Sequence, residues 1–138
     1  MACAAALLVF SINSAGEAQA ATCTSTGTGN WSSPSIWSGC GGGVPGAADT
    51  VVIANLNHTV TVDTNRSASA VTFTAGGNYS NFTLANGVTL NVTNTMTVNG
   101  ATGGSGTRRV TVGVNAVLNV GGDLVMNGGS NNNRDTEL

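Results

Sequence analysis

The sequence predicts an all-β protein, a right-handed parallel β-helix (solenoid) of about three coils of three strands, with a disulfide-stapled N-terminal cap. Two observations lead to this prediction. Apolar and polar residues alternate in nine short segments, which indicates strands with one buried face. Several of these segments recur at one fixed offset along the chain, and a fixed period of roughly 20–50 residues is typical of stacked repeats.

The repeat is clearest in two stretches, GVTLNVTNTMTVNG (87–100) and NAVLNVGGDLVMNGG (115–129). In a parallel β-helix each strand pairs with its counterpart one coil later, so like residues stack on like. We expect Leu90 to stack on Leu118 inside the coil and Asn91 on Asn119 outside it. Asn-Gly pairs stand where the chain would turn corners, because both residues tolerate positive φ.

The nine alternating segments are centred on Val51/Ile53, Val60/Val62, Val71/Phe73, Phe82/Leu84, Leu90/Val92, Met96/Val98, Val110/Val112, Leu118/Val120 and Leu124/Met126. Taken in order they form three rounds of three strands. The first round departs from the common offset of 28 residues, since it would pair Val51 with Phe82, Val60 with Leu90 and Val71 with Met96. A β-sandwich of hairpins is the competing fold, because Asn-Gly is also a hairpin signal. The sandwich does not explain an offset shared by three strands.

The chain divides into four regions: a signal peptide (1–20), an N-terminal cap (21–46), the β-helix coils (47–129) and a polar tail (130–138). The apolar run MACAAALLVF followed by Ala18-Gln19-Ala20 is typical of a secretory leader with its cleavage site. A short buried N-terminal helix is the alternative. We expect a protein that is exported through the periplasm and is secreted or held at the bacterial cell surface.

The cysteine content agrees with export. Cys3 would leave with the leader, and Cys23 and Cys40 remain as an even pair. One histidine, His58, cannot complete a zinc site with two distant thiols. We therefore predict a Cys23–Cys40 disulfide, as expected in an oxidising compartment, with two buried free thiols as the alternative.

The cap region holds both tryptophans, Trp31 and Trp37. A solenoid needs covered ends, so a disulfide-stapled loop with two large rings would serve as a lid on the first coil. The more specific alternative is that the two rings form a surface on which a sugar ring stacks. After Met126 nothing apolar follows until Leu138, and we expect the chain to continue into further coils or domains.

Composition excludes several classes of function. Charged residues make up 7% of the chain, lysine is absent, and the formal net charge is −2, which argues against a nucleic-acid partner. No apolar run reaches the roughly 20 residues of a membrane span. The chain is not of the disordered type either, because hydrophobic residues reach 41%.

Candidate catalytic residues are few. Asp49 and Asp63 could in principle form a glycosidase pair, but their positions beside strands favour turn capping. His58 is expected in a turn, without a recognisable nucleophile. We predict no catalytic residues, no metal site and no cofactor.

The segment from Gly103 to Arg109 is the other candidate contact region. Its glycines resemble a phosphate loop, but the Lys-Ser/Thr that a P-loop needs does not follow them. Arg108 and Arg109 could bind an anion, whereas a solvated strand start is the plainer interpretation. Trp31, Trp37, Arg108 and Arg109 are therefore the candidate ligand contacts.

The run NWSSPSIWSGCGGGVPGAADTVVI (30–53), followed by HTVTVD (58–63), resembles the start of bacterial secreted β-helix surface proteins. It is similar to the G8-type domain, to the N-terminal part of MshQ-like proteins and to adhesins of the filamentous-haemagglutinin type. The resemblance covers roughly residues 22–100 and implies a β-helix displayed on the cell surface. It implies no catalytic residues.

These observations together predict the non-catalytic, structural or adhesive N-terminal region of a secreted bacterial surface protein, an adhesin stalk or display scaffold. Its partners would be surface glycans or proteins of a host or the environment. The alternative is a carbohydrate-binding or carbohydrate-processing β-helix module, with Trp31, Trp37 and the 103–109 segment as contacts.

Overall fold

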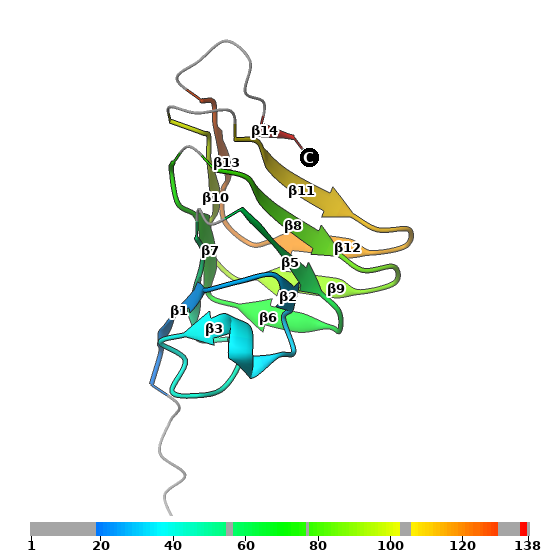
Figure 1. Ribbon diagram of the computed structural model, residues 1–138. Coiled ribbons are helices and arrows are strands. Elements are labelled where there is room, and N and C mark those ends of the chain that lie inside the picture. Colours follow the sequence, from blue (N-terminus) through cyan, green and yellow to red (C-terminus); the bar gives the residue numbers. More distant parts are fainter. Residues whose placement is uncertain (1–18, 55–56, 77, 103–105, 130–135, 138) are drawn as a thin grey trace, which may run out of the picture.

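The computed structural model describes residues 19–137 apart from 55–56, 77, 103–105 and 130–135. The chain is an all-β parallel solenoid of about four turns, whose strands stack into three sheets (Figure 1). The predicted fold class is thus confirmed. The proposed leader, residues 1–20, lies almost wholly outside the described residues.

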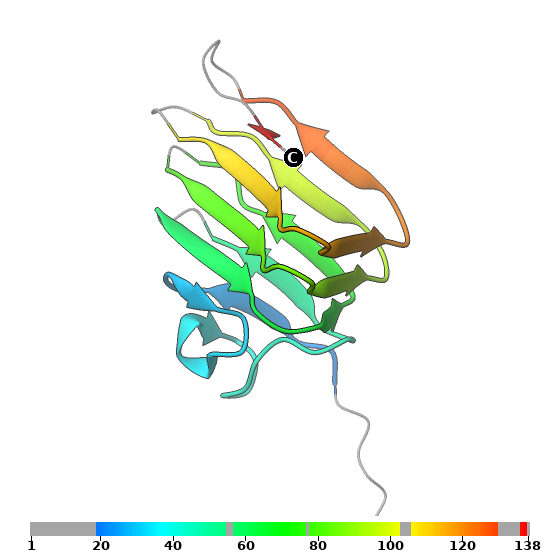
Figure 2. The same cartoon turned by 90° about the vertical axis from the view of Figure 1, so that its right-hand side faces the viewer.

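The turns contribute strands to three sheets, which we name A, B and C. Sheet A holds β1 (Thr22–Ser25), β3 (Trp37–Ser38), β4 (Thr50–Ile53), β7 (Ala70–Phe73), β10 (Met96–Asn99) and β13 (Leu124–Asn127). Sheet B holds β2 (Gly29–Asn30), β5 (His58–Val62), β8 (Ser80–Leu84), β11 (Arg108–Val112) and β14 (Thr136–Glu137). Sheet C holds β6 (Arg66–Ala68), β9 (Thr89–Val92) and β12 (Val117–Val120). One short 3-10 helix, η1 (Pro34–Ile36), lies in the cap. Figure 2 shows the strands as successive rungs along the solenoid.

The predicted register of the later turns is confirmed. Leu90 pairs with Leu118 and Met96 with Leu124, at the offset that the repeat predicts. On the outer surface the Asn119 side-chain amide donates to Asn91 Oδ1 at 2.8 Å, so this polar ladder is hydrogen-bonded as well as aligned. Parallel pairing at a constant offset is therefore what the repeated sequence encodes.

The core consists of the inward residues of all three sheets. Burial alternates strictly along β5 and β8, with every second side chain buried. Burying a single Val, Leu or Phe side chain stabilises the fold by about 1.5–3 kcal/mol. These side chains form continuous columns from turn to turn. The inward apolar side chains of each turn therefore pack against those of the turn before it.

Two of the three pairings predicted for the first round are wrong, and the third, Val71 with Met96, is confirmed. Val51 pairs with Val71 rather than with Phe82, and Val60 pairs with Phe82 rather than with Leu90. The cause is β6, the sheet C strand of this turn, which reads Arg66-Ser67-Ala68 and has no two large apolar residues in alternation. Alternation of large apolar residues therefore does not reveal β6. Without this strand, the strands that follow it are counted in the wrong turn of the solenoid.

Parallel strand pairing begins within the segment that the sequence predicts to be the cap. β1 pairs in parallel with β4, and β2 pairs in parallel with β5, so the solenoid already begins within the segment 21–46. The inward residues of β1 are Cys23 and Ser25, which are too small and polar to register as a hydrophobic pattern. The rest of the segment does act as a cap: β3 runs antiparallel to β1 along the outer edge of sheet A.

Glycine is required at two of the corners for different reasons. Gly87, in the expected Asn-Gly corner, has a φ of 71°, a conformation that side chains with a Cβ rarely adopt. At Gly100 the limit is space, because a Cβ there would lie 2.4 Å from the backbone nitrogen of Gly129. The close stacking of successive corners therefore leaves no room for a side chain at Gly100.

The last described turn is less well covered than the others. Leu118, expected inside, is only partly buried, and Val114, Val117 and Leu124 are exposed. Part of the expected polar tail instead forms β14, which pairs with β11 and extends sheet B. Among the described residues no strand lies beyond β12 or β13, and their inward side chains are accordingly more accessible.

Candidate functional site

The two tryptophans of the cap are packed against each other. Trp31 is fully buried and its indole N–H donates to the carbonyl of Pro45 at 3.2 Å. Trp37 is buried too, and its indole N–H donates to the carbonyl of Trp31 at 2.9 Å. The rings meet edge to face at a centroid distance of 5.2 Å. Both rings lie inside the cap, whereas a sugar-stacking platform needs an exposed ring face.

The predicted disulfide is present. Cys23 on β1 is joined to Cys40 in the loop that follows β3. The alternative of two free thiols is therefore wrong. The bond fastens the loop that follows Trp37 and β3 to the first strand of the solenoid.

The two adjacent arginines, Arg108 and Arg109, face opposite ways along β11. Arg108 is fully buried, and its guanidinium donates to the carbonyls of Thr74, Gly76 and Asn78. Burial lowers the pKa of Arg108 from its usual value. These contacts hold the connection between β7 and β8. Arg109 is exposed on the outer face, so it is the member of the pair that a ligand in solution can reach.

A buried serine and histidine come together in a way that the sequence did not indicate. Ser25 on β1 and His58 on β5 are both buried, and Ser25 Oγ lies 2.8 Å from His58 Nε2. The backbone N–H of Ala54 donates to the same hydroxyl at 2.9 Å, and Ser80 donates to the carbonyl of Ala54. The two residues are 33 positions apart, so no local motif could have revealed the pair.

This pair has the distance of a Ser–His dyad but not the surroundings of a nucleophile. Ser25 is inaccessible to solvent, and its oxygen already accepts the Ala54 N–H. A catalytic histidine is oriented by a third group on its other nitrogen, whereas among the described residues His58 Nδ1 is buried without a hydrogen-bond partner. The arrangement instead ties β1, β5 and the end of β4 together.

The buried histidine makes stability depend on pH. Burial lowers the pKa of His58 below its usual value of 6.5, so the unfolded chain takes up the proton more readily than the folded one. The contribution of uncharged His58 to the free energy of unfolding should therefore be fully present above pH 6.5. It should decrease as the pH falls from 6.5 towards the lower pKa of the folded state. Urea unfolding at about pH 7.5 and about pH 5.5 would measure the loss.

His58 is the sole histidine of the chain, so His58→Gln removes the only side chain that normally titrates in this interval. The variant should lose the pH dependence between these two values, whatever its stability at neutral pH. An equal loss of stability in both proteins would show that His58 is not its source.

The two aspartates near the cap hold backbone groups. Asp49 accepts the backbone N–H groups of Ala21 and Gly46, each at 2.8 Å, and Asp63 accepts both the N–H and the hydroxyl of Ser32. Burial raises the pKa of Asp63, but the bonds from Ser32 and the charge of Arg66 lower it, and the net shift is downward. Asp49 thus caps a local turn at Gly46, the role favoured by the sequence, whereas Asp63 holds Ser32, which lies 31 residues earlier in the chain.

A cleft of about 330 Å³ opens between the cap loop and the first strand of sheet C. It is lined by Pro45, Gly46, Ala47, Asn65, Arg66, Ser67 and Asn91. The cleft exists because, among the described strands, the first turn contributes to sheets A and B but not to sheet C, which leaves the free edge of β6 facing the loop. Arg66 is the one charged residue of this lining, and no sequence motif marks it as a site residue.

Within the described part of the chain, no group of three or more His, Cys, Asp or Glu residues is placed to hold a metal ion. The same residues contain no helix of the length and apolarity needed to cross a bilayer. The chain matches no protein-family model, no curated protein and no solved structure at a significant level. The β-solenoid implied by the resemblance to bacterial surface proteins is present, whereas membership of one of those families is not supported by any match.

Proposed function

We propose that this protein is a non-catalytic scaffold of the bacterial cell surface, the structural or adhesive N-terminal region of an adhesin stalk or display protein. The observation that favours this role most is the architecture itself. Turns stack in register on a continuous apolar core, and a disulfide-bonded cap covers the first of them. Such an element presents corner loops and outer faces at fixed spacings for contact with surface glycans or proteins.

Export is supported by two independent features. The Ala18-Gln19-Ala20 motif after an apolar run is typical of a cleaved leader. A disulfide persists in an oxidising compartment and is rare in the cytosol. The resemblance of residues 22–100 to G8-type, MshQ-like and filamentous-haemagglutinin-like proteins supports the same location.

A non-catalytic role is supported by how the reactive groups are used. The carboxylates of Asp49 and Asp63 accept backbone N–H groups, and the Ser25 hydroxyl is buried. The second candidate, a carbohydrate-binding module, is favoured by one specific observation, the cleft that Arg66, Asn65 and Asn91 help to line.

The location is tested by expressing the full chain with a C-terminal epitope tag in a Gram-negative host. We expect the mature protein to begin at Ala21, to contain an oxidised Cys23–Cys40 pair and to be protected in the periplasm or displayed on intact cells. A matched chain that starts at Ala21 should stay in the cytoplasm with reduced thiols. A full-length chain that keeps residues 1–20 and remains cytoplasmic would overturn the proposal.

A further inference from the structure

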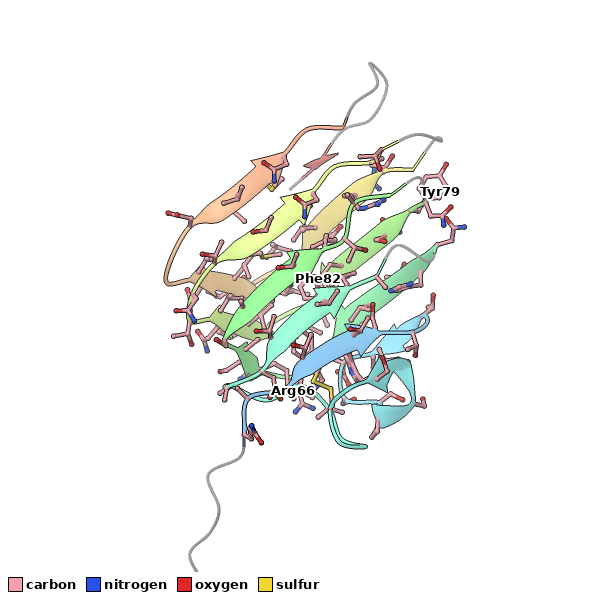
Figure 3. The ribbon with its side chains drawn as sticks, turned by 90° about the vertical axis from the view of Figure 1, so that its left-hand side faces the viewer. Arg66, Tyr79 and Phe82 are labelled. Atoms are coloured by element: carbon pink, nitrogen blue, oxygen red, sulfur yellow. A yellow bond between two sulfur atoms is a disulfide. The ribbon has the colours of Figure 1, made fainter. Side chains whose placement is uncertain are left out.

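Arg66 occupies a position that the neighbouring turns fill with apolar residues. On sheet C it pairs with Leu90, which in turn pairs with Leu118. Leu90 is fully buried in the core, whereas Arg66 is half-buried at the free edge of the sheet and lines the cleft beneath the cap loop. Figure 3 shows Arg66 at the capped end of the solenoid.

The guanidinium of Arg66 is not fully satisfied by the protein. Its Nε is buried and, among the described residues, has no hydrogen-bond partner. A buried polar group without a partner costs about 1–3 kcal/mol, and more if it is charged. Asp63 is close enough for the charge of Arg66 to lower its pKa, but its oxygens accept the N–H and hydroxyl of Ser32.

The amides that line the cleft also offer donors. Asn65 accepts the backbone N–H of Thr89 through its Oδ1 at 2.8 Å, and Asn91 accepts the Asn119 amide through its Oδ1 at 2.8 Å. In both residues the oxygen is engaged, so each has N–H groups left to offer. Together with Arg66 they make a lining that is rich in donors and carries a positive charge.

We propose that this cleft binds the carboxylate of an acidic monosaccharide. A guanidinium presents parallel N–H donors in the fork geometry that matches a carboxylate, and the neighbouring amides suit further acceptor oxygens. The volume, about 330 Å³, lies at the lower end of the range for small-molecule sites. Pro45 and Ala47 are the apolar side chains of the lining, against which the C–H face of a sugar ring can pack. This site adds a ligand to the scaffold and does not depend on where the protein is located.

The test is a titration of the purified protein with glucuronate, followed by NMR of the side-chain N–H groups. We expect saturable shifts of the Arg66, Asn65 and Asn91 signals. Glucose, which has the same ring but no carboxylate, should bind at least about tenfold more weakly. Inorganic sulfate separates a carboxylate-sugar site from a general anion site, and it should also bind more weakly than glucuronate.

Three variants locate the site. Arg66→Gln should weaken glucuronate binding by at least about tenfold, whereas Arg109→Gln, which removes the same charge from the outer face of sheet B, should leave it unchanged. Arg66→Lys keeps the charge but loses the fork, and it should fall between wild type and Arg66→Gln. It also serves if Arg66→Gln does not fold.

Three outcomes would overturn the proposal. The first is the absence of saturable shifts with glucuronate. The second is binding of glucose or sulfate as strong as that of glucuronate. The third is an equal loss of affinity in Arg66→Gln and Arg109→Gln.

Discussion

Replacing Phe82 with alanine is expected to destabilise the protein by about 3–5 kcal/mol, the range typical of large aromatic truncations in a core. Phe82 is fully buried on β8 and connects the cap to the body of the solenoid. Its ring meets that of Trp31 edge to face at 6.1 Å and that of Phe73 at 5.8 Å. Alanine would leave a cavity at the point where all three rings pack.

Thr83→Ala is the matched control for this variant. Thr83 is the next residue of the same strand, and it lies half-exposed on the outer face. Its loss should change the free energy of unfolding by less than about 1 kcal/mol. Urea denaturation of both variants measures the difference. Similar costs for the two would contradict the alternation of buried and outward side chains along β8.

Removing the disulfide is the second change with a large expected effect. The double variant Cys23→Ala/Cys40→Ala opens a loop closed over a sequence separation of 17 residues. The chain-entropy model gives a loss of about 3 kcal/mol. Alanine is preferable to serine here because Cys23 is fully buried and a hydroxyl would need a partner.

Wild-type protein with its disulfide reduced provides the comparison for the double variant. Both should unfold at similarly lowered urea concentrations, and the fluorescence of Trp31 and Trp37 should report loosening of the cap. A double variant as stable as the oxidised wild type would mean that packing of the two rings alone holds the cap. The expected contribution of the disulfide would then be wrong.

The candidate site was harder to predict than the fold. Hydrophobic periodicity detects strands with two large inward residues, and it therefore missed Arg66-Ser67-Ala68 and the small inward residues of β1. The contact between Ser25 and His58 and the cleft at Arg66 both depend on these undetected strands. The sequence predicts Arg108 and Arg109 together as ligand contacts, whereas alternation along β11 places only Arg109 outside.

The sequence by itself determined the class of fold, the stacking of the later turns and the disulfide. A repeat of alternating residues at a fixed offset can bury its apolar face only by stacking in register, and two cysteines in a chain expected to be exported pair readily. The tertiary structure alone decided where the first turn begins and where a cleft opens. The start of the first turn depends on β1, whose inward residues are small, and the cleft depends on the absence of a described first-turn strand from sheet C. Neither the small inward residues of β1 nor Arg66 gives a periodic apolar signal.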